Sequence, residues 1–120
     1  MWGDRTLSTS TVRVDESVVV LRVRGGVDVA TAPVLREALE AARADVVVVD
    51  LTGVDFFTSW GIEPLVQSHD RLLDRAGALH LVVTRQIRRV LSSVGLHHVL
   101  QMHGSAEAAL AAVAEADEWG

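Results

Sequence analysis

Cysteine, lysine and tyrosine are absent from this chain of 120 residues. Without cysteine, the chain can form neither a disulfide nor a thiolate metal site. Without lysine, it cannot build the phosphate-binding loop of the P-loop nucleotide hydrolases, and neither a GxGxxG nor a GxSxG pattern occurs. A tyrosine general acid is excluded as well. Because no catalytic constellation or cofactor motif is left, the sequence predicts a protein that is not an enzyme and has no cofactor.

The chain also lacks long apolar runs and a surplus of basic residues. No segment approaches the roughly 18 apolar residues of a membrane span, and Met1–Arg5 does not resemble the start of a signal peptide. The formal net charge is −5, whereas nucleic-acid-binding domains usually carry a basic surface. We therefore expect a cytoplasmic protein that neither inserts into a membrane nor binds nucleic acid directly.

Short β-branched runs alternate with segments of helical periodicity along the chain. The predicted strands are residues 18–23, 46–49, 79–83 and 99–102. The predicted helices begin near Thr31, Ile62, Thr84 and Ser105. This alternation indicates one α/β domain with a mostly parallel or mixed sheet of four to five strands and about four helices.

The ends of the domain are predicted from composition. We expect the domain to span residues 12–116. Residues 1–11 are expected to form a leader or an edge strand, and residues 117–120 a loose tail.

Val46–Val49 predict a central strand that is covered on both faces, because four consecutive apolar side chains point alternately to both sides of a sheet. Gly25-Gly26 is expected to end the strand before it, and residues 51–61 to form a loop. Gly77 and Gly95 are expected to stop two helices. The predicted buried helix positions are Leu35, Ala38, Leu39 and Ala42; then Ile62, Leu65, Val66, His69, Leu72, Leu73 and Ala76; and then Ile87, Val90, Leu91 and Val94.

Three histidines lie close together in the sequence, at His97, His98 and His103. A metal site also requires orienting partners and usually a carboxylate or cysteine ligand. In an extended segment, His97 and His98 would point to opposite sides. A solvated loop without a metal is therefore the favoured interpretation, and His69 is expected to be a satisfied histidine in or at the edge of the core.

Two further polar groups have ordinary interpretations. Arg85, Arg88 and Arg89 fall opposite the apolar stripe of their helix, which favours a solvated face over an anion site. Asp50 and Asp55 flank the loop predicted after the valine strand. They could act as an acid–base pair if a pocket were present, or Asp50 could accept hydrogen bonds from loop amides.

Asp28 and Ser59 each follow a predicted strand. Because the carboxyl ends of parallel strands meet at one edge of a sheet, we expect these two residues to share that rim. Pro64 cannot donate a hydrogen bond to the carbonyl four residues earlier. The next helix should therefore begin near Gly61 or Ile62, with Glu63 in its first turn and Ser59 in the loop before it.

Three segments together resemble the STAS domain family, in the form of the anti-sigma factor antagonists. RGGVDVATAP, residues 24–33, is similar to the family's G-E-L-D-x-x-T-A segment. VVVVDLTGVDFFTSWGI, residues 46–62, resembles its D-L-S-G-V-x-F-x-D-S-x-G-L segment. TRQIRRVLSSVGL, residues 84–96, is similar to its S-P-x-V-R-R-x-L-x-x-x-G-L segment. They occur in the family's order, and the resemblance covers about residues 12–113.

The resemblance implies a bacterial regulatory module that controls transcription by partner switching. In such antagonists, a serine is phosphorylated by a kinase of ATPase fold that is also the anti-sigma factor. The unphosphorylated antagonist binds that partner and releases the sigma factor. By position, the serine is Ser59. The alternative is a STAS subunit that docks in a larger assembly, such as a lipid-transport complex, without phosphorylation.

The resemblance assigns partner binding to the surroundings of this serine. The expected contact residues are Asp28, Thr58, Ser59, Trp60, Gly61 and Glu63. The chain departs from the family pattern at Thr58, which stands where the family has aspartate, at Trp60, and at Glu63-Pro64. Gly26 replaces the glutamate of the first segment. Trp60 is either an exposed anchor for the partner or a core residue folded onto Phe56 or Phe57.

Overall fold

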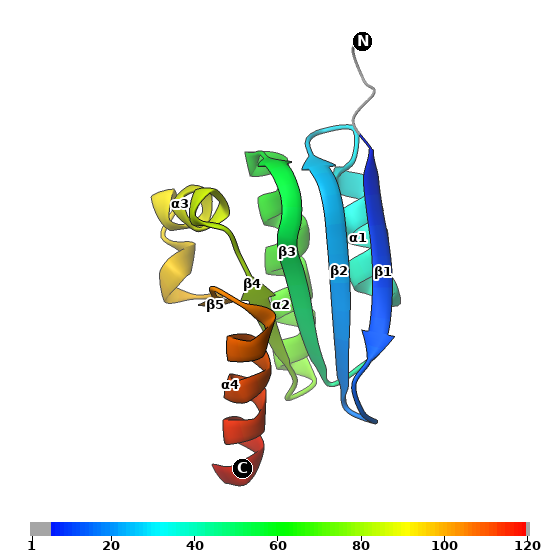
Figure 1. Ribbon diagram of the computed structural model, residues 1–120, viewed down its shortest axis with the longest axis vertical. Coiled ribbons are helices and arrows are strands. Elements are labelled where there is room, and N and C mark those ends of the chain that lie inside the picture. Colours follow the sequence, from blue (N-terminus) through cyan, green and yellow to red (C-terminus); the bar gives the residue numbers. More distant parts are fainter. Residues whose placement is uncertain (1–5, 120) are drawn as a thin grey trace.

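The computed structural model describes the backbone of residues 6–119 and the side chains of residues 6–116. One mixed sheet has the strand order β1-β2-β3-β4-β5 (Figure 1). β1 runs antiparallel to β2, and all the other neighbours are parallel. The strands are β1 (Leu7–Arg13), β2 (Val18–Val27), β3 (Val46–Phe57), β4 (Ala78–Val82) and β5 (Gln101–His103).

Helices connect the parallel strands and cover the sheet. The α-helices of the described residues are α1 (Ala32–Ala41), α2 (Ile62–Asp74), α3 (Arg85–Ser93) and α4 (Ala106–Trp119). Two short 3-10 turns, η1 (Ser59–Gly61) and η2 (Leu96–His98), precede α2 and β5. Five strands in a mixed sheet with four helices confirm the predicted single α/β domain.

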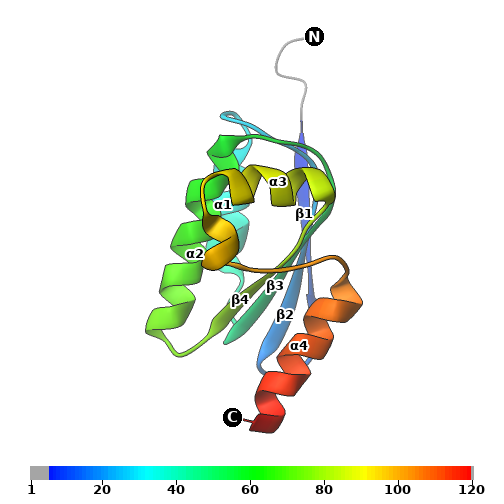
Figure 2. The same cartoon turned by 90° about the vertical axis from the view of Figure 1, so that its left-hand side faces the viewer.

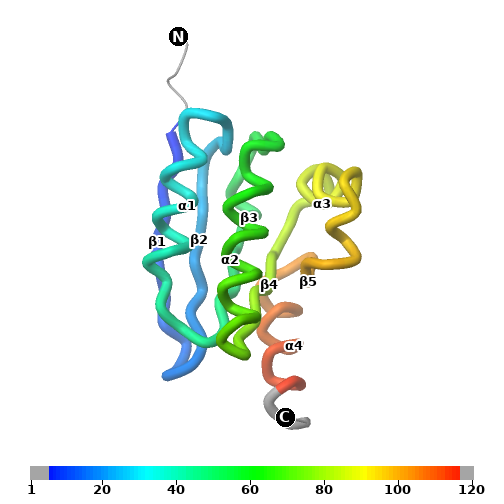
Figure 3. Tube along the Cα trace, turned by 180° about the vertical axis from the view of Figure 1, so that it is seen from behind, coloured from blue at the N-terminus to red at the C-terminus, as the bar shows by residue number. Residues whose placement is uncertain are grey.

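β3 is the central strand, and its valine run is buried as predicted. α1 and α2 lie behind the sheet in the view of Figure 1, whereas α4 lies in front of it, as the side view of Figure 2 and the rear view of Figure 3 show. Val47 and Val49 join the main core under α1 and α2, and Val48 packs with Ala109 and Val113 of α4. Val47, Val48 and Val49 are at most 1% exposed, and Val46 is half-buried. Helices therefore cover the strand on both faces.

Two predicted interruptions are instead continuous strand. β2 passes through Gly25-Gly26 to Val27, with register shifts against β3 on both sides of Arg24. Gly25 has a φ of +114°, and a Cβ there would lie 2.1 Å from the carbonyl oxygen of Thr6. The glycine pair therefore permits a β-bulge rather than ending the strand. β3 likewise continues to Phe57, so the predicted loop over residues 51–61 is wrong for its first seven residues.

Most helix boundaries follow the predicted caps. The side chains of Thr84 and Ser105 accept hydrogen bonds from the backbone of α3 and α4, and Gly95 stops α3 with a φ of +81°. Gly77 does not play that role for α2. Ala76 adopts the left-handed conformation, with a φ of 59°. Gly77 is needed instead because a Cβ would lie 2.2 Å from the carbonyl oxygen of Asp45.

Of the fifteen predicted stripe positions, six are buried, six are half-buried and three near the helix ends are exposed. Leu35, Leu39, Leu65, Leu72, Ile87 and Leu91 are at most 4% exposed. Leu73 and Val94, by contrast, are 56% and 58% exposed, and Ala76 is exposed as well, so the prediction is wrong at these three positions at or just beyond the ends of α2 and α3. α4 continues to Trp119, past the predicted end near Ala116. The domain limits at residues 12 and 116 remain a prediction.

Within the described residues, no helix is both long and apolar enough to span a membrane.

Candidate functional site

The carboxyl ends of β2 and β3 lie side by side, as the strand register predicts. Val27 is paired with Phe57, the last residue of β3. Thr58 then donates two hydrogen bonds to the carbonyl oxygen of Val27, from its N–H over 3.0 Å and from its Oγ1 over 2.9 Å. Asp28 and Ser59 are the residues just beyond this connection, so both lie on one rim of the sheet as expected.

Thr58 thus has a structural role that an aspartate could not fill in the same way. A deprotonated carboxylate accepts hydrogen bonds and cannot donate one to the carbonyl of Val27. Thr58 is half-buried, and its hydroxyl fixes the start of the turn that carries Ser59.

The Asp28 carboxylate organises the turn into α1. Its Oδ1 accepts hydrogen bonds from the N–H groups of Ala30, over 2.9 Å, and Thr31, over 3.0 Å. The Thr31 hydroxyl donates to the carbonyl oxygen of Gly26 over 2.6 Å and accepts from the N–H of Asp28 over 3.0 Å. Thr31 therefore ties the turn to the end of β2 and does not cap α1 through its side chain.

Ser59 opens the 3-10 turn η1 and is exposed. Regular α-helix begins at Ile62 with Gly61 as N-cap, which puts Glu63 in the first turn. This start agrees with the argument from Pro64, whose missing N–H excludes an α-helical bond to Trp60. Gly61 is buried, and a Cβ there would lie 2.6 Å from two ring carbons of Phe57. The absence of that Cβ lets the turn pack directly on the end of the core.

Trp60 is on the surface. It is 58% exposed, whereas Phe57 is 4% exposed in the main core. The alternative in which Trp60 folds into the core is therefore wrong. A large aromatic side chain beside an exposed serine hydroxyl is available for contact with another molecule.

A depression of about 490 Å³ lies on the rim between α1 and the start of α2. Its lining residues are Val29, Ala32, Pro33, Arg36, Ser59, Trp60 and Glu63. One wall thus comes from the predicted Ser59 segment and the other from α1. Arg36 joins the walls, because its Nη2 lies 3.4 Å from Oε1 of Glu63, which also accepts from Nε2 of Gln67 over 3.2 Å.

The α1 wall was missed from sequence, although part of its signal is present there. Val29 is 58% exposed in the turn before α1. Pro33 and Arg36 follow at helical spacings that share one face. The spacing could have identified this face, but only the tertiary packing of α1 against α2 brings Arg36 to Glu63.

The other polar groups lie elsewhere. Arg85, Arg88 and Arg89 are exposed on α3, as expected for a solvated face. Asp50 lies within β3 and accepts hydrogen bonds from the N–H and Oγ1 of Thr52, so it serves local backbone and not a loop. Asp55 is exposed on the same strand.

The histidines pair in an unpredicted way. His97 and His98 lie in the 3-10 turn η2 with ring centroids 3.9 Å apart, so the segment is not extended and the two rings do not point to opposite sides. His103 instead meets His80, with Nδ1 of His80 3.0 Å from Nε2 of His103. Burial lowers the pKa of both rings; nearby His103 lowers that of His80 further, and Arg88 that of His103.

His69 is half-buried on α2. Its Nδ1 has no hydrogen-bond partner in the described part of the chain, so the prediction of a satisfied histidine is wrong. Among the residues that the structure describes, no three histidine, aspartate or glutamate side chains gather as metal ligands would.

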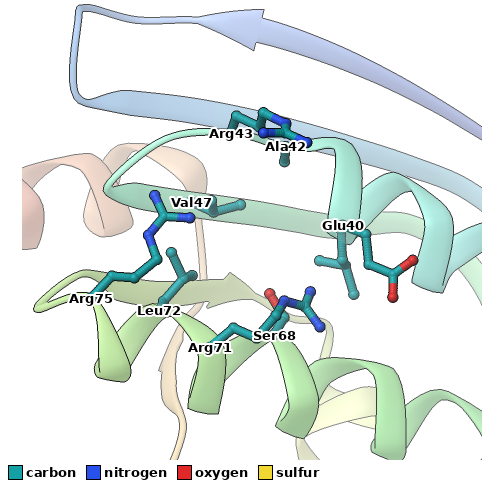
Figure 4. Close-up of a pocket in the computed structure, with 9 residues that line it drawn as sticks. Glu40, Ala42, Arg43, Val47, Ser68, Arg71, Leu72 and Arg75 are labelled. Carbon is teal, nitrogen blue, oxygen red and sulfur yellow. The ribbon is translucent and has the colours of Figure 1, made fainter.

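A second cleft, of about 210 Å³, lies between the carboxyl-terminal ends of α1 and α2 (Figure 4). Arg43, Arg71 and Arg75 surround it, and the buried Ser68 lies at its side. Arg75 donates to the carbonyl oxygen of Ala44 and lies 3.9 Å from Asp45. None of the predicted site residues lines this cleft.

Comparison with known proteins supports one family. The model of the STAS domain matches residues 9–109. Anti-sigma-F factor antagonist RsfA of Mycobacterium tuberculosis (strain ATCC 25618 / H37Rv) is 28% identical over 109 residues, which cover 86% of this chain and 85% of that protein.

Solved structures agree with that assignment. A crystal structure of an anti-sigma factor antagonist from Mycobacterium paratuberculosis has a TM-score of 0.83 at 28% identity, and the match covers 90% of this chain and 94% of that one. Unphosphorylated SpoIIAA, an anti-sigma factor antagonist, shares the fold with a TM-score of 0.73 at 19% identity, over 90% of this chain and 97% of that one. The chain belongs to the STAS domain family.

Proposed function

We propose that this chain is a cytoplasmic anti-sigma factor antagonist, a binding protein without catalytic activity of its own. Its partner is an anti-sigma factor that is also a serine kinase of ATPase fold. The unphosphorylated chain binds this partner and so releases a sigma factor. The observation that carries the proposal is the exposed pair Ser59 and Trp60 beside the rim depression.

The chemistry of the rim supports docking there. Trp60, Val29 and Pro33 expose apolar surface around the depression, and tryptophan is enriched among residues that dominate interface energy. Asp28, Ser59 and Glu63 add polar groups around this apolar patch. Thr58 and the buried Gly61 contribute by positioning the turn rather than by touching the partner.

The position of Ser59 also suits a charge switch. In the proposed reaction, the γ-phosphoryl group of ATP passes to Oγ of Ser59, the hydroxyl proton is lost and ADP leaves. The product carries roughly −1.5 to −2 charge near neutral pH. The kinase must accept the neutral hydroxyl as its substrate. A surface that fits this hydroxyl closely is destabilised by the product's charge, and the phosphorylated chain is therefore released.

Co-purification tests the partner class. Tagged full-length chain is expected to retain an ATPase-fold kinase, and a Ser59→Glu variant to retain much less. Asp28→Asn is expected to weaken capture but not the fold, because asparagine keeps the Oδ1 acceptor of the turn. Retention of transporter subunits instead, equally by both Ser59 forms, would contradict the proposal.

Incubation of the purified pair with ATP tests the modification. Intact-mass spectrometry is expected to detect one added phosphoryl group in the natural chain and none in Ser59→Ala. Ser93→Ala, which changes an exposed serine on α3, is the matched control and should be modified like the natural chain. Modification of Ser59→Ala to the same extent would refute the site.

A further inference from the structure

Arg36 is the one basic side chain among the residues that line the Ser59 depression. It extends from α1 to the first turn of α2, where Nη2 lies 3.4 Å from Oε1 of Glu63. That separation is long for a charge-assisted hydrogen bond, which is normally about 2.7–2.9 Å. The Glu63 side chain is 69% exposed, whereas that of Arg36 is 35% exposed. Arg36 is thus held over the depression by a weak, solvent-screened contact that can be exchanged.

Ser59 and Glu63 are four residues apart across the junction of η1 and α2. Both residues line the same depression. A phosphate on Ser59 would therefore lie next to the Glu63 carboxylate, on the depression that Arg36 already lines. Glu63 repels it, whereas Arg36 and the amino-terminal end of α2 attract it.

We infer that Arg36 receives the phosphate of phosphorylated Ser59 and leaves Glu63 to do so; this inference rests on the proposed phosphorylation of Ser59. The phosphate carries more charge than a carboxylate, and a guanidinium binds phosphate through two parallel hydrogen bonds. The exchange removes the α1–α2 bridge between Arg36 and Glu63 and replaces it with a bridge from α1 to η1. Arg36 is accordingly a positioning residue that stabilises the phosphorylated form.

The second ionisation of the phosphate reports this contact without any partner protein. The probe is full-length chain with phosphoserine installed at position 59 during translation, titrated by phosphorus NMR. The charged groups around the phosphate are Arg36 from α1, Glu63 from α2 and Asp28 from the β2–α1 turn. A cation at contact distance favours the dianion, so Arg36 is expected to hold the second pKa of the phosphoserine below the value of about 6 that is usual for this group.

Two substitutions should move this pKa in opposite directions. Arg36→Gln should raise it by about 0.7 unit or more, the effect of one unit charge about 4 Å away in water. Glu63→Gln should lower it, because it removes a negative neighbour and frees Arg36. Arg89→Gln, which removes an exposed arginine on α3, is the matched control and should leave it within about 0.2 unit, since solvent screens a distant charge.

A shift for Arg36→Gln no larger than that for Arg89→Gln would overturn the inference, as would shifts of equal sign for Arg36→Gln and Glu63→Gln. Circular dichroism of the same samples verifies that each variant is folded. If Arg36→Gln did not fold, Arg36→Lys would replace it. Lysine keeps the positive charge but cannot donate two parallel hydrogen bonds. If neither the phosphate pKa nor the NMR signal of the residue 59 amide changed in Arg36→Lys, the result would count against the bidentate contact. This titration contains no partner protein. A phosphate pKa that does not respond to Arg36→Gln would therefore overturn the role of Arg36 but not the proposed function. A failure to co-purify a kinase would contradict the proposed function but would not change the titration result.

Discussion

Replacement of Trp60 by alanine separates a docking role from a folding role. Trp60 is 58% exposed. A tryptophan presents about 250 Å² at most, so about 145 Å² is free for a partner to cover. At about 25 cal/mol per Å² this area corresponds to at most about 3.6 kcal/mol. Because association has its own costs, we expect Trp60→Ala to weaken partner binding by about 2–3 kcal/mol, or about 30- to 160-fold.

The cost to folding should be smaller. The covered part of Trp60 is about 105 Å², with an upper limit of about 2.6 kcal/mol. The alanine Cβ keeps some of this contact and the unfolded chain already covers part of it, so about 1 kcal/mol is expected. Calorimetric titration with the kinase partner measures affinity, and urea unfolding measures stability.

Leu73→Ala supplies the control, because Leu73 is 56% exposed on α2 but does not line the rim depression. It should change stability to a similar extent and leave affinity unchanged. Equal losses of affinity in the two variants, or a stability loss in Trp60→Ala as large as its affinity loss, would refute the docking role.

Other substitutions test the rim and the core around it. Gly61→Ala should lower the free energy of unfolding by about 1–3 kcal/mol, because its Cβ would lie 2.6 Å from ring carbons of the buried Phe57; an unchanged urea midpoint would contradict the packing. Burial lowers the pKa of His80 and of its partner histidine, so the unfolded chain takes up protons first as pH falls. Their contribution to the free energy of unfolding should be complete above about pH 6.5 and lost as the pH falls below it. In thermal melts from about pH 8 to 5, stability should therefore fall more steeply in the natural chain than in His80→Gln. An equal fall of stability with pH in both proteins would exclude the histidine pair as the cause. The double substitution Glu63→Gly and Pro64→Val should speed phosphorylation by the cognate kinase, since it removes a carboxylate beside the incoming phosphate. Intact-mass time courses in which the natural chain is modified as fast and as completely as the variant would disprove that expectation.

Unbroken apolar runs and helix-capping residues predicted their elements well. Four consecutive valines are typical of a strand covered on both faces, and the structure buries Val47, Val48 and Val49 there, with Val46 half-buried. Thr84 and Gly95 delimit α3 because capping depends on a few local atoms.

The extension of β3 to Phe57 could not be predicted in the same way. Thr52, Gly53 and Asp55 are typical turn formers, and the register shifts against β2 break the alternation that identifies a strand. Neighbouring strands, not local sequence, hold this segment extended. The left-handed Ala76 is similar, because its conformation follows from the helix-terminal hydrogen bonds of Ala76 and Gly77 to α2 and from the close approach of Gly77 to Asp45.

Only the part of the candidate site around Asp28 and Ser59 could be predicted from the sequence. The rule for parallel strands places Asp28 and Ser59 on one rim, and Pro64 sets the start of α2. The position of Arg36 and of the α1 wall of the depression depends on how α1 packs against α2. The spacing of residues within either helix does not predict that packing.

The most direct test of the account is the affinity of the kinase partner for the chain before and after phosphorylation at Ser59. Both forms are titrated in one buffer with a non-hydrolysable ATP analogue, so that the modification state stays fixed. We expect the phosphorylated chain to bind about 5- to 150-fold more weakly, the range of a coupling of about 1–3 kcal/mol. Equal affinities for the two forms would contradict a switch at Ser59.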